Sequence, residues 1–149
     1  MTINERIKEI RRSSGLSQTD FAERLGTTRG VITNLSNLIG CRALYFNHNL
    51  RAEEDAGLPE DYLNYIREQI RKNVLAFMDS YEQIAVPGYQ SGPPLLLYPL
   101  YSNIMYYGVI VVEGTRALTE LDEAAILQTK MRCISCICIK QTYLSSGCG

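Results

Sequence analysis

Thirty consecutive residues, from Gln83 to Val112, carry no charge, and this run constrains the fold more than any other feature of the chain. It is longer than the roughly 20 apolar residues that a membrane-spanning helix needs. Four prolines and three glycines interrupt it, however, and each interior proline removes a backbone hydrogen bond and clashes with the preceding turn. The run therefore excludes one continuous spanning helix, and we expect no membrane partner.

The same run favours β-strands. Its β-branched and aromatic residues fall into three segments that proline-glycine and serine-asparagine signals separate. We expect antiparallel strands over residues 83–86, 95–101 and 105–112, with Ser102-Asn103 as a hairpin turn.

Other elements surround these strands. A fourth strand is expected over residues 39–46, ahead of a turn at 47–49. Apolar residues at steps of three or four predict a helix over residues 59–79, with Pro59 at its start. Thr119 begins a last helix, whose end the pattern leaves open.

Before residue 38 the pattern is entirely helical. Thr2-x-x-Glu5 is a capping box that opens a helix over residues 2–13. Ser17 begins a second, short helix that stops at Gly26, and Thr27 begins a third. Two short helices joined by a tight turn have the form of a helix-turn-helix. The predicted fold class is α+β: a small all-α head followed by an antiparallel sheet with flanking helices.

Charge and cysteine content suit a cytoplasmic protein. The 15 basic and 16 acidic residues nearly balance, although residues 1–37 carry six basic against four acidic side chains and are slightly basic. The chain opens with MTINERIKEIRR, which is not a secretory signal, so we expect its five cysteines to be reduced.

The helical segment contains a specific pattern: Ile10-Arg11, Gly15-Leu16-Ser17-Gln18, Phe21-Ala22-x-x-Leu25-Gly26 and Val31-Ile32. With it, residues 5–35 closely resemble the Cro/repressor (XRE) family of helix-turn-helix DNA-binding domains. The resemblance implies that Gln18 meets a phosphate, and that exposed residues of the third helix read bases in the major groove of double-stranded DNA. The residues implied to face DNA are Gln18, Thr27, Thr28, Arg29, Thr33 and Asn34.

The chemistry of these side chains agrees with that implication. Arginine pairs with guanine and asparagine with adenine in the major groove, which suits Arg29 and Asn34. The alternative is that they are solvated polar positions on small helices. The chain also departs from the family, because nothing after Asn37 looks like the two further helices that complete its five-helix core.

A second resemblance covers residues 40–140. Its order of elements, with Pro99-Leu100, Gly108 and the helix start at 118–123, looks like the GAF-like sensor module of PucR-type (purine catabolism regulator, CdaR-like) transcription factors. Those regulators usually carry a C-terminal DNA-binding domain that is not found here, so an N-terminal head could replace it. The expected domains are a helix-turn-helix head over 1–37 and a GAF-like sensor or dimerisation domain over 38–149.

Other clusters offer chemistry but favour ordinary roles. Cys133, Cys136 and Cys138 alternate with isoleucines, which indicates buried thiols rather than a metal site. His48 is the only histidine, so a two-histidine metal site and a histidine triad of the usual kind are excluded. With no phosphate-binding loop either, we expect no enzyme, cofactor or metal. Four tyrosines beside the hairpin suit sheet packing, a dimer surface or a pocket for a planar ligand: Tyr98, Tyr101, Tyr106 and Tyr107.

These observations favour a sequence-specific transcriptional regulator with a sensor-like or dimerisation domain. We expect it to act as a homodimer, because one short recognition helix contacts too few base pairs for useful specificity. A small-molecule effector is possible and the sequence does not name it. The alternative is a ligand-binding or protein-binding regulatory module without DNA-binding activity.

Overall fold

The computed structural model describes residues 2, 3, 5, 6, 9, 28–52, 57–80, 83–102 and 105–145. It confirms an α+β fold in which helices flank one antiparallel sheet. The helices are α3 (Thr28–Ile39), α4 (Glu60–Ser80) and α5 (Glu120–Ser145), with a short 3-10 helix, η1 (Tyr89–Ser91). The strands are β1 (Ala43–Phe46), β2 (Ile84–Val86), β3 (Leu95–Ser102) and β4 (Met105–Glu113).

The sheet has the strand order β1-β4-β3-β2, and each neighbouring pair is antiparallel. The expected hairpin is confirmed as β3 and β4, which pair from Leu95 opposite Glu113 to Ser102 opposite Met105. The two outer strands are short, with four residues in β1 and three in β2. The central hairpin therefore provides most of the surface on which the helices pack.

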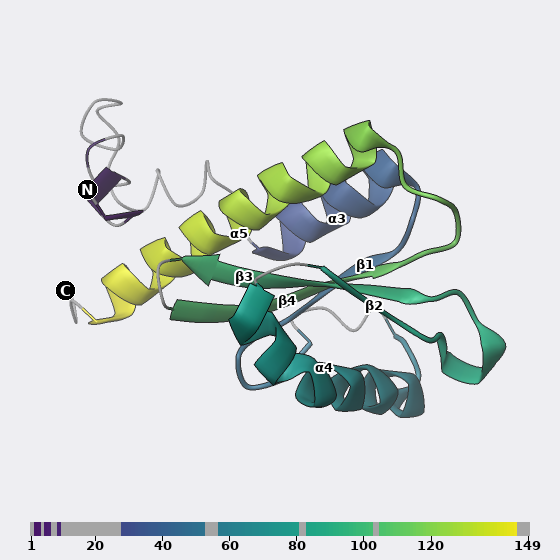
Figure 1. The fold of residues 1–149 in the computed structure, drawn as a ribbon. Helices are drawn as coiled ribbons and strands as arrows, with labels where there is room; N and C mark the ends of the chain where they lie inside the picture. The colour runs from purple at the N-terminus through teal and green to yellow at the C-terminus, as the bar shows by residue number, and fades with distance from the viewer. Residues whose placement is uncertain are drawn as a thin grey trace.

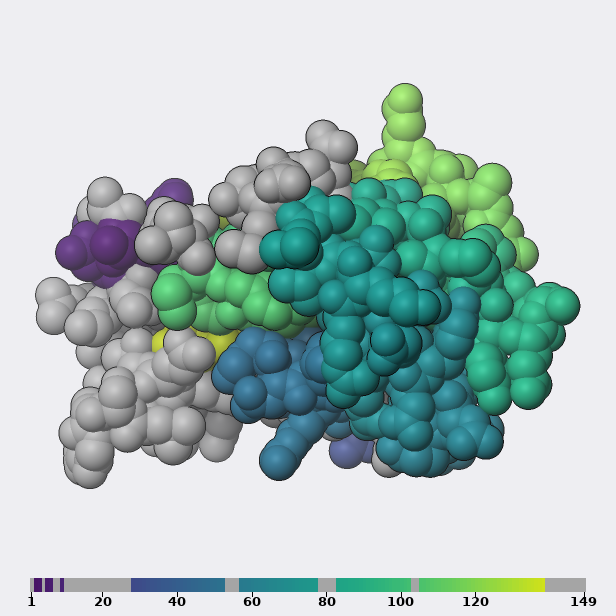
Figure 2. All heavy atoms as spheres, turned by 60° about the horizontal axis from the view of Figure 1, so that its bottom comes forward, coloured from purple at the N-terminus to yellow at the C-terminus, as the bar shows by residue number. Residues whose placement is uncertain are grey.

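Helices cover both faces of this sheet (Figure 1). The first face carries α3 and α5, which lie side by side, and the second carries α4. Figure 2 shows the second side, where the teal side chains of α4 form part of the surface. Alternation along β3 supplies both cores: Tyr98 and Leu100 pack beneath α3 and α5, whereas Leu95 and Leu97 pack beneath α4.

The structure shows where the last helix ends. Its capped start is confirmed, because the Asp122 backbone N–H donates to Thr119 Oγ1 (3.2 Å) and the Thr119 N–H donates to Asp122 Oδ2 (2.8 Å). The helix continues through residues 133–139, the segment that the pattern left open, and ends at Ser145.

The strand expected from residue 39 is wrong in its first four positions. Ile39 is the last residue of α3 and is 1% exposed, because its i+4 spacing from Leu35 extends the buried face of the helix. Gly40 ends α3 with a φ of +67°, and its N–H donates to the Ser36 carbonyl (3.0 Å). The domain boundary expected between residues 37 and 38 thus falls inside a helix.

At the N-terminus the expected capping box is present. The Glu5 N–H donates to Thr2 Oγ1 (3.1 Å), and the Thr2 N–H donates to Glu5 Oε2 (3.0 Å). Residues 3, 5, 6 and 9 are helical. The second expected helix, after Ser17, lies outside the described residues.

We predict that Gly108→Ala destabilises the fold far more than Gly40→Ala. Both glycines have a positive φ, +120° and +67°, but a Cβ at Gly108 would lie 2.2 Å from the Phe46 carbonyl oxygen, whereas one at Gly40 meets nothing within 4 Å. Backbone strain alone costs about 1–2 kcal/mol, and the added clash with β1 brings the expected loss at Gly108 to about 3 kcal/mol or more. Urea unfolding measures both losses, and equal losses would contradict the clash.

Candidate nucleic-acid interface

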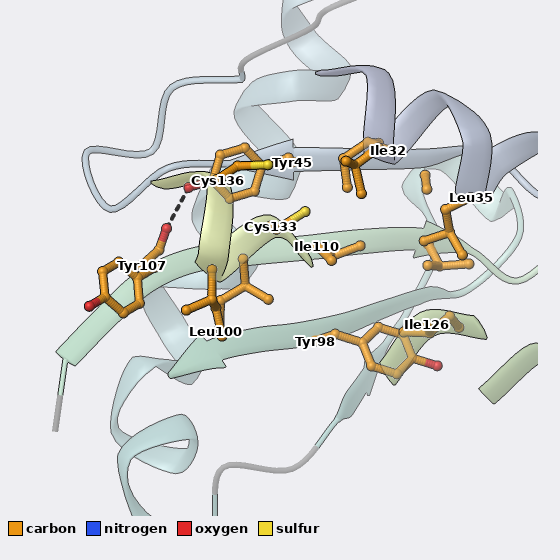
Figure 3. Close-up of a cluster of buried hydrophobic side chains, with 14 of the residues drawn as sticks. Ile32, Leu35, Tyr45, Tyr98, Leu100, Tyr107, Ile110, Ile126, Cys133 and Cys136 are labelled. Carbon is orange, nitrogen blue, oxygen red and sulfur yellow. Dashed lines mark hydrogen bonds between the residues drawn. The ribbon is translucent and has the colours of Figure 1, made fainter. Parts of the chain in front are cut away.

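The helix α3 is amphipathic, and its apolar face is fixed to the body of the protein. Val31, Ile32, Leu35 and Ile39 are each no more than 3% exposed and join one core with residues of β1, β4 and α5. Figure 3 shows Ile32 and Leu35 in the same cluster as Ile110 of β4 and Cys133 of α5. The orientation of α3 is therefore set by the sheet.

The opposite face of α3 is exposed and mainly polar. Arg29, Thr33 and Asn37 follow one another every four residues, so they form a row along the helix. Asn34 and Leu38 continue a second row beside it, and both are exposed. The surface thus presents a guanidinium group, a hydroxyl group and two amides, which are the groups that hydrogen-bond to base edges and phosphates.

Three of the six predicted contact residues lie on this face: Arg29, Thr33 and Asn34. Gln18 and Thr27 lie outside the described residues. Thr28 is 2% exposed, so its side chain does not share the exposed face. Its spacing from Val31, Ile32 and Leu35 places it on the buried side of the helix. The predicted set did not include Asn37, which also lies on the exposed face. Its spacing of four residues from Thr33 indicates this position.

A serine joins α3 to the sheet by hydrogen bonds. The Ser36 hydroxyl donates to the Ile32 carbonyl (3.2 Å), and its oxygen accepts the backbone N–H of Ala43 in β1 (2.9 Å). The hydroxyl group therefore connects the last turns of α3 to the first residue of the strand that follows.

A charged pair holds the end of α3 against the start of α5. The Arg116 guanidinium donates from Nη1 to Asp122 Oδ2 (2.7 Å) and from Nη2 to Asp122 Oδ1 (3.0 Å). The same Nη2 donates to the carbonyl oxygen of Ile39, the last residue of α3 (2.5 Å). A cation at this position also suits the negative end of the helix dipole. Arg116 therefore connects the two helices directly.

The acid of this pair is stabilised in its charged form. Hydrogen bonds from the Arg116 side chain, and then from the Thr119 backbone and hydroxyl, hold the pKa of Asp122 well below its usual range. The carboxylate thus caps α5 and binds Arg116 at the same time.

The four tyrosines of the hairpin divide between the two faces of the sheet. Tyr98 and Tyr107 pack in the core beneath α3 and α5, whereas Tyr101 and Tyr106 lie on the α4 side with ring centroids 5.3 Å apart. The Tyr45 hydroxyl donates to the Tyr107 carbonyl, as the dashed line in Figure 3 shows. Sheet packing accounts for these rings, and they do not gather into one pocket.

The expectation of buried thiols is confirmed for the cysteines of α5 that the structure describes. Cys133, Cys136 and Cys138 are each no more than 4% exposed, and burial raises the pKa of Cys133 to about 12. The sulfur of Cys138 lies 3.6 Å from the Tyr107 hydroxyl. Within the described ranges, no group of three or more His, Cys, Asp or Glu side chains is placed to hold a metal ion.

Comparison with known proteins supports the interpretation of the N-terminal segment. A family model described as Helix-turn-helix (HTH_3) matches residues 7–37, about a fifth of the chain. The match includes most of α3, and it supports a DNA-binding regulator in general. None of the curated proteins matches this chain.

A solved structure is similar to the larger part of the chain. It is the GAF domain/HD domain protein from Geobacter sulfurreducens, with a TM-score of 0.46 and 14% sequence identity, over 80% of this chain and 96% of that chain. The GAF-like and PucR-type character of residues 40–140 stays a prediction. Among the residues described, no helix has the length and apolarity needed to span a membrane.

We predict that Asp122→Asn lowers stability at neutral pH and that the difference from the unsubstituted protein shrinks in acid. A carboxyl group whose pKa is lowered by folding adds stability above its ordinary pKa of about 4, and that contribution is lost as the pH falls further. Unfolding by urea at pH 7, 5 and 3 measures the difference. Asp61→Asn is the control, because Asp61 is an exposed carboxyl in the first turn of α4. A difference that persists unchanged at pH 3 would contradict the ionic role.

Proposed function

We propose that this protein is a sequence-specific, DNA-binding transcriptional regulator in which α3 is the recognition helix. The observation that carries the proposal is the helix-turn-helix match over residues 7–37 together with the division of α3 into a buried apolar face and an exposed polar face. A helix that reads base edges must present its polar side chains while the rest of the domain holds its backbone.

The core beneath α3 supports this role. In a head of three short helices, little apolar area is buried, and such a unit is marginal by itself. Here the apolar face of α3 rests on the sheet and α5 instead, so the body supplies the support that two further helices give in the XRE family. The proposal assigns no catalytic activity, cofactor or metal to the chain, and a cytoplasmic location follows from a role on DNA.

We predict that Arg29→Ala relaxes sequence preference, whereas Gln18→Ala weakens binding to all duplexes alike. An arginine that pairs with guanine contributes about 1–3 kcal/mol to discrimination, while an amide on a phosphate carries no sequence information. Selection from random duplexes with the full chain, followed by gel-shift titration, measures both effects.

The control variant is Arg71→Ala. Arg71 is exposed on α4, across the sheet from α3, and its loss removes the same charge without touching the proposed interface. If the protein binds no duplex even at low salt, the proposal fails, and a ligand-binding or protein-binding module without DNA activity takes its place.

The regulator is further proposed to act as a two-fold homodimer held mainly by the body. Two large apolar side chains of α5 support this part: Leu121 and Met131 are 82% and 57% exposed. Exposed apolar side chains along one helix are typical of a partner surface, and a symmetric dimer would place two recognition helices on one duplex.

We predict that Leu121→Glu combined with Met131→Glu converts the dimer to a monomer without unfolding it. Both side chains are exposed, so the charges cost little in the monomer but repel across a two-fold interface. Light scattering on the full chain at tens of micromolar measures the mass. The control is Leu75→Glu on α4, which is 77% exposed and lies on the other side of the sheet. A monomeric unsubstituted protein would overturn the proposed dimer.

A further inference from the structure

A groove lies between the sheet and the first half of α5. One cavity of about 370 Å³ is lined by Gln83, Tyr98, Glu123, Ile126, Leu127 and Lys130. A second cavity of about 390 Å³ continues toward Pro94, Leu96 and Arg116 and shares Gln83 and Glu123 with the first. Because the cavities share these residues, they form one feature, which we name the α5 groove. Each is within the size range of small-molecule sites, about 300–1,000 Å³.

The α5 groove lies on the side of α5 that faces away from α3. Gln83 immediately precedes β2, which is one edge strand of the sheet, whereas α3 packs on β1, the opposite edge strand. The helix α5 therefore separates the groove from the proposed recognition helix and contacts both.

The first cavity has apolar walls and oppositely charged ends. Leu127 provides exposed apolar surface, and the buried Ile126 and Tyr98 side chains lie beneath it on the sheet side. Glu123 and Lys130 are seven residues apart on α5, which corresponds to about 10 Å along the helix axis. A molecule in this cavity would meet a carboxylate near one end and an ammonium group near the other.

The two charged ends differ in their partners. Glu123 accepts a hydrogen bond from the Tyr98 hydroxyl (3.3 Å). Lys130 is half-buried, and among the described residues it makes neither an ion pair nor a hydrogen bond. Its burial lowers the pKa of its ammonium group. An anion beside Lys130 would supply a counter-charge that none of the described residues provides.

We propose that the α5 groove binds a small organic carboxylate, with its apolar body along Leu127 and its anionic group on Lys130. A carboxylate suits this position better than an amine does, because among the described residues that line the first cavity Lys130 has no hydrogen bond or ion pair, whereas the other charged side chain, Glu123, accepts a hydrogen bond from Tyr98. The apolar walls favour a hydrocarbon chain or a single ring over a highly polar metabolite.

Occupancy of the groove would act on α3 through α5. Arg116 lines the second cavity and also donates to the Ile39 carbonyl at the end of α3, so one side chain contacts both the groove and the recognition helix. A ligand that shifts α5 or Arg116 would change how α3 is held. This regulatory step rests on the proposed DNA-binding function, whereas carboxylate binding does not.

The binding test uses 3-phenylpropanoate and hexanoate with the full chain, observed by saturation-transfer NMR and by titration of backbone amide shifts. Their amides, 3-phenylpropanamide and hexanamide, and hexylamine are the matched probes without the negative charge. We expect both carboxylates to bind with millimolar or better affinity, and the amides and the amine to bind at least tenfold more weakly. Failure of both carboxylates at 10 mM, or equal binding of the amides, would overturn the proposal.

Variants locate the site. Lys130→Met keeps the apolar stem but removes the charge and should weaken carboxylate binding at least tenfold, while Lys130→Arg should retain it. Ala124→Phe adds a ring at an exposed position that lines the first cavity and should block it without altering Lys130. Lys72→Met removes an exposed charge from α4 as the control. Unchanged binding in both Lys130→Met and Ala124→Phe would place the carboxylate elsewhere and overturn the assignment.

A second measurement separates this proposal from the proposed function. Duplex affinity is titrated with and without the carboxylate, and we expect a change of about fivefold or more that is absent in Lys130→Met. If the protein binds the carboxylate but no duplex, the carboxylate site stands and the proposed DNA-binding function fails. If it binds duplexes but no carboxylate, the DNA-binding function stands and the carboxylate site fails. Binding of both without any effect on each other would overturn the regulatory link.

Discussion

The arrangement of the whole molecule depends on the burial of the apolar face of α3 against the sheet and α5. Burying a side chain such as Ile32 or Leu35 contributes about 1.5–3 kcal/mol. Four such residues of α3 are almost fully buried, against a typical total stability of only 5–15 kcal/mol for a domain. Detaching this helix would therefore cost free energy on the scale of the entire fold. The proposed recognition helix is therefore part of the packed body and not a separate head on a linker.

The polar contacts around α3 fix the position of the helix on the sheet. Hydrophobic burial holds the helix on the sheet but does not by itself fix its position along its own axis. The Ser36 hydroxyl group and the Arg116 guanidinium group both bond near the C-terminal end of α3, one to β1 and the other to the last carbonyl of the helix. That end is thus the fixed end. Arg29 lies at the opposite end, one residue after the start of the helix.

Local signals in the sequence predicted the separate elements well. The helix α4, the β3–β4 hairpin and the capped start of α5 depend on turn residues, capping residues and short-range periodicity, all of which lie within a few positions of one another. The capping residues Thr119 and Asp122 form the expected bonds. The Arg116 contact to Ile39, by contrast, joins residues 77 positions apart, and no short-range pattern indicates it.

Two expectations at α3 differ from the structure, each for its own reason. Placing the domain boundary after Asn37 followed from the end of the family pattern, while the helix continues to Ile39 because a β-strand and α5 cover its apolar side. The assignment of Thr28 to the DNA-facing set came from the resemblance, yet its spacing from Val31 and Ile32 places it on the covered side. The α5 groove was beyond sequence reasoning, because its residues come from separate segments before β2, within β3 and along α5, which only the folded sheet brings together.

The way in which α3 is covered restricts how the proposed regulator meets DNA. Since α3 stays on the body, a duplex that reaches Arg29, Thr33 and Asn34 must also approach the surface beside α3, and α5 forms one side of that surface. The first turn of α5 is acidic, with Glu120, Asp122 and Glu123, of which Asp122 is neutralised by Arg116. The remaining negative charges disfavour phosphates near the C-terminal end of α3. Contact would therefore be concentrated at the N-terminal half of α3, where Arg29 lies and where the rest of the helix-turn-helix pattern adjoins it.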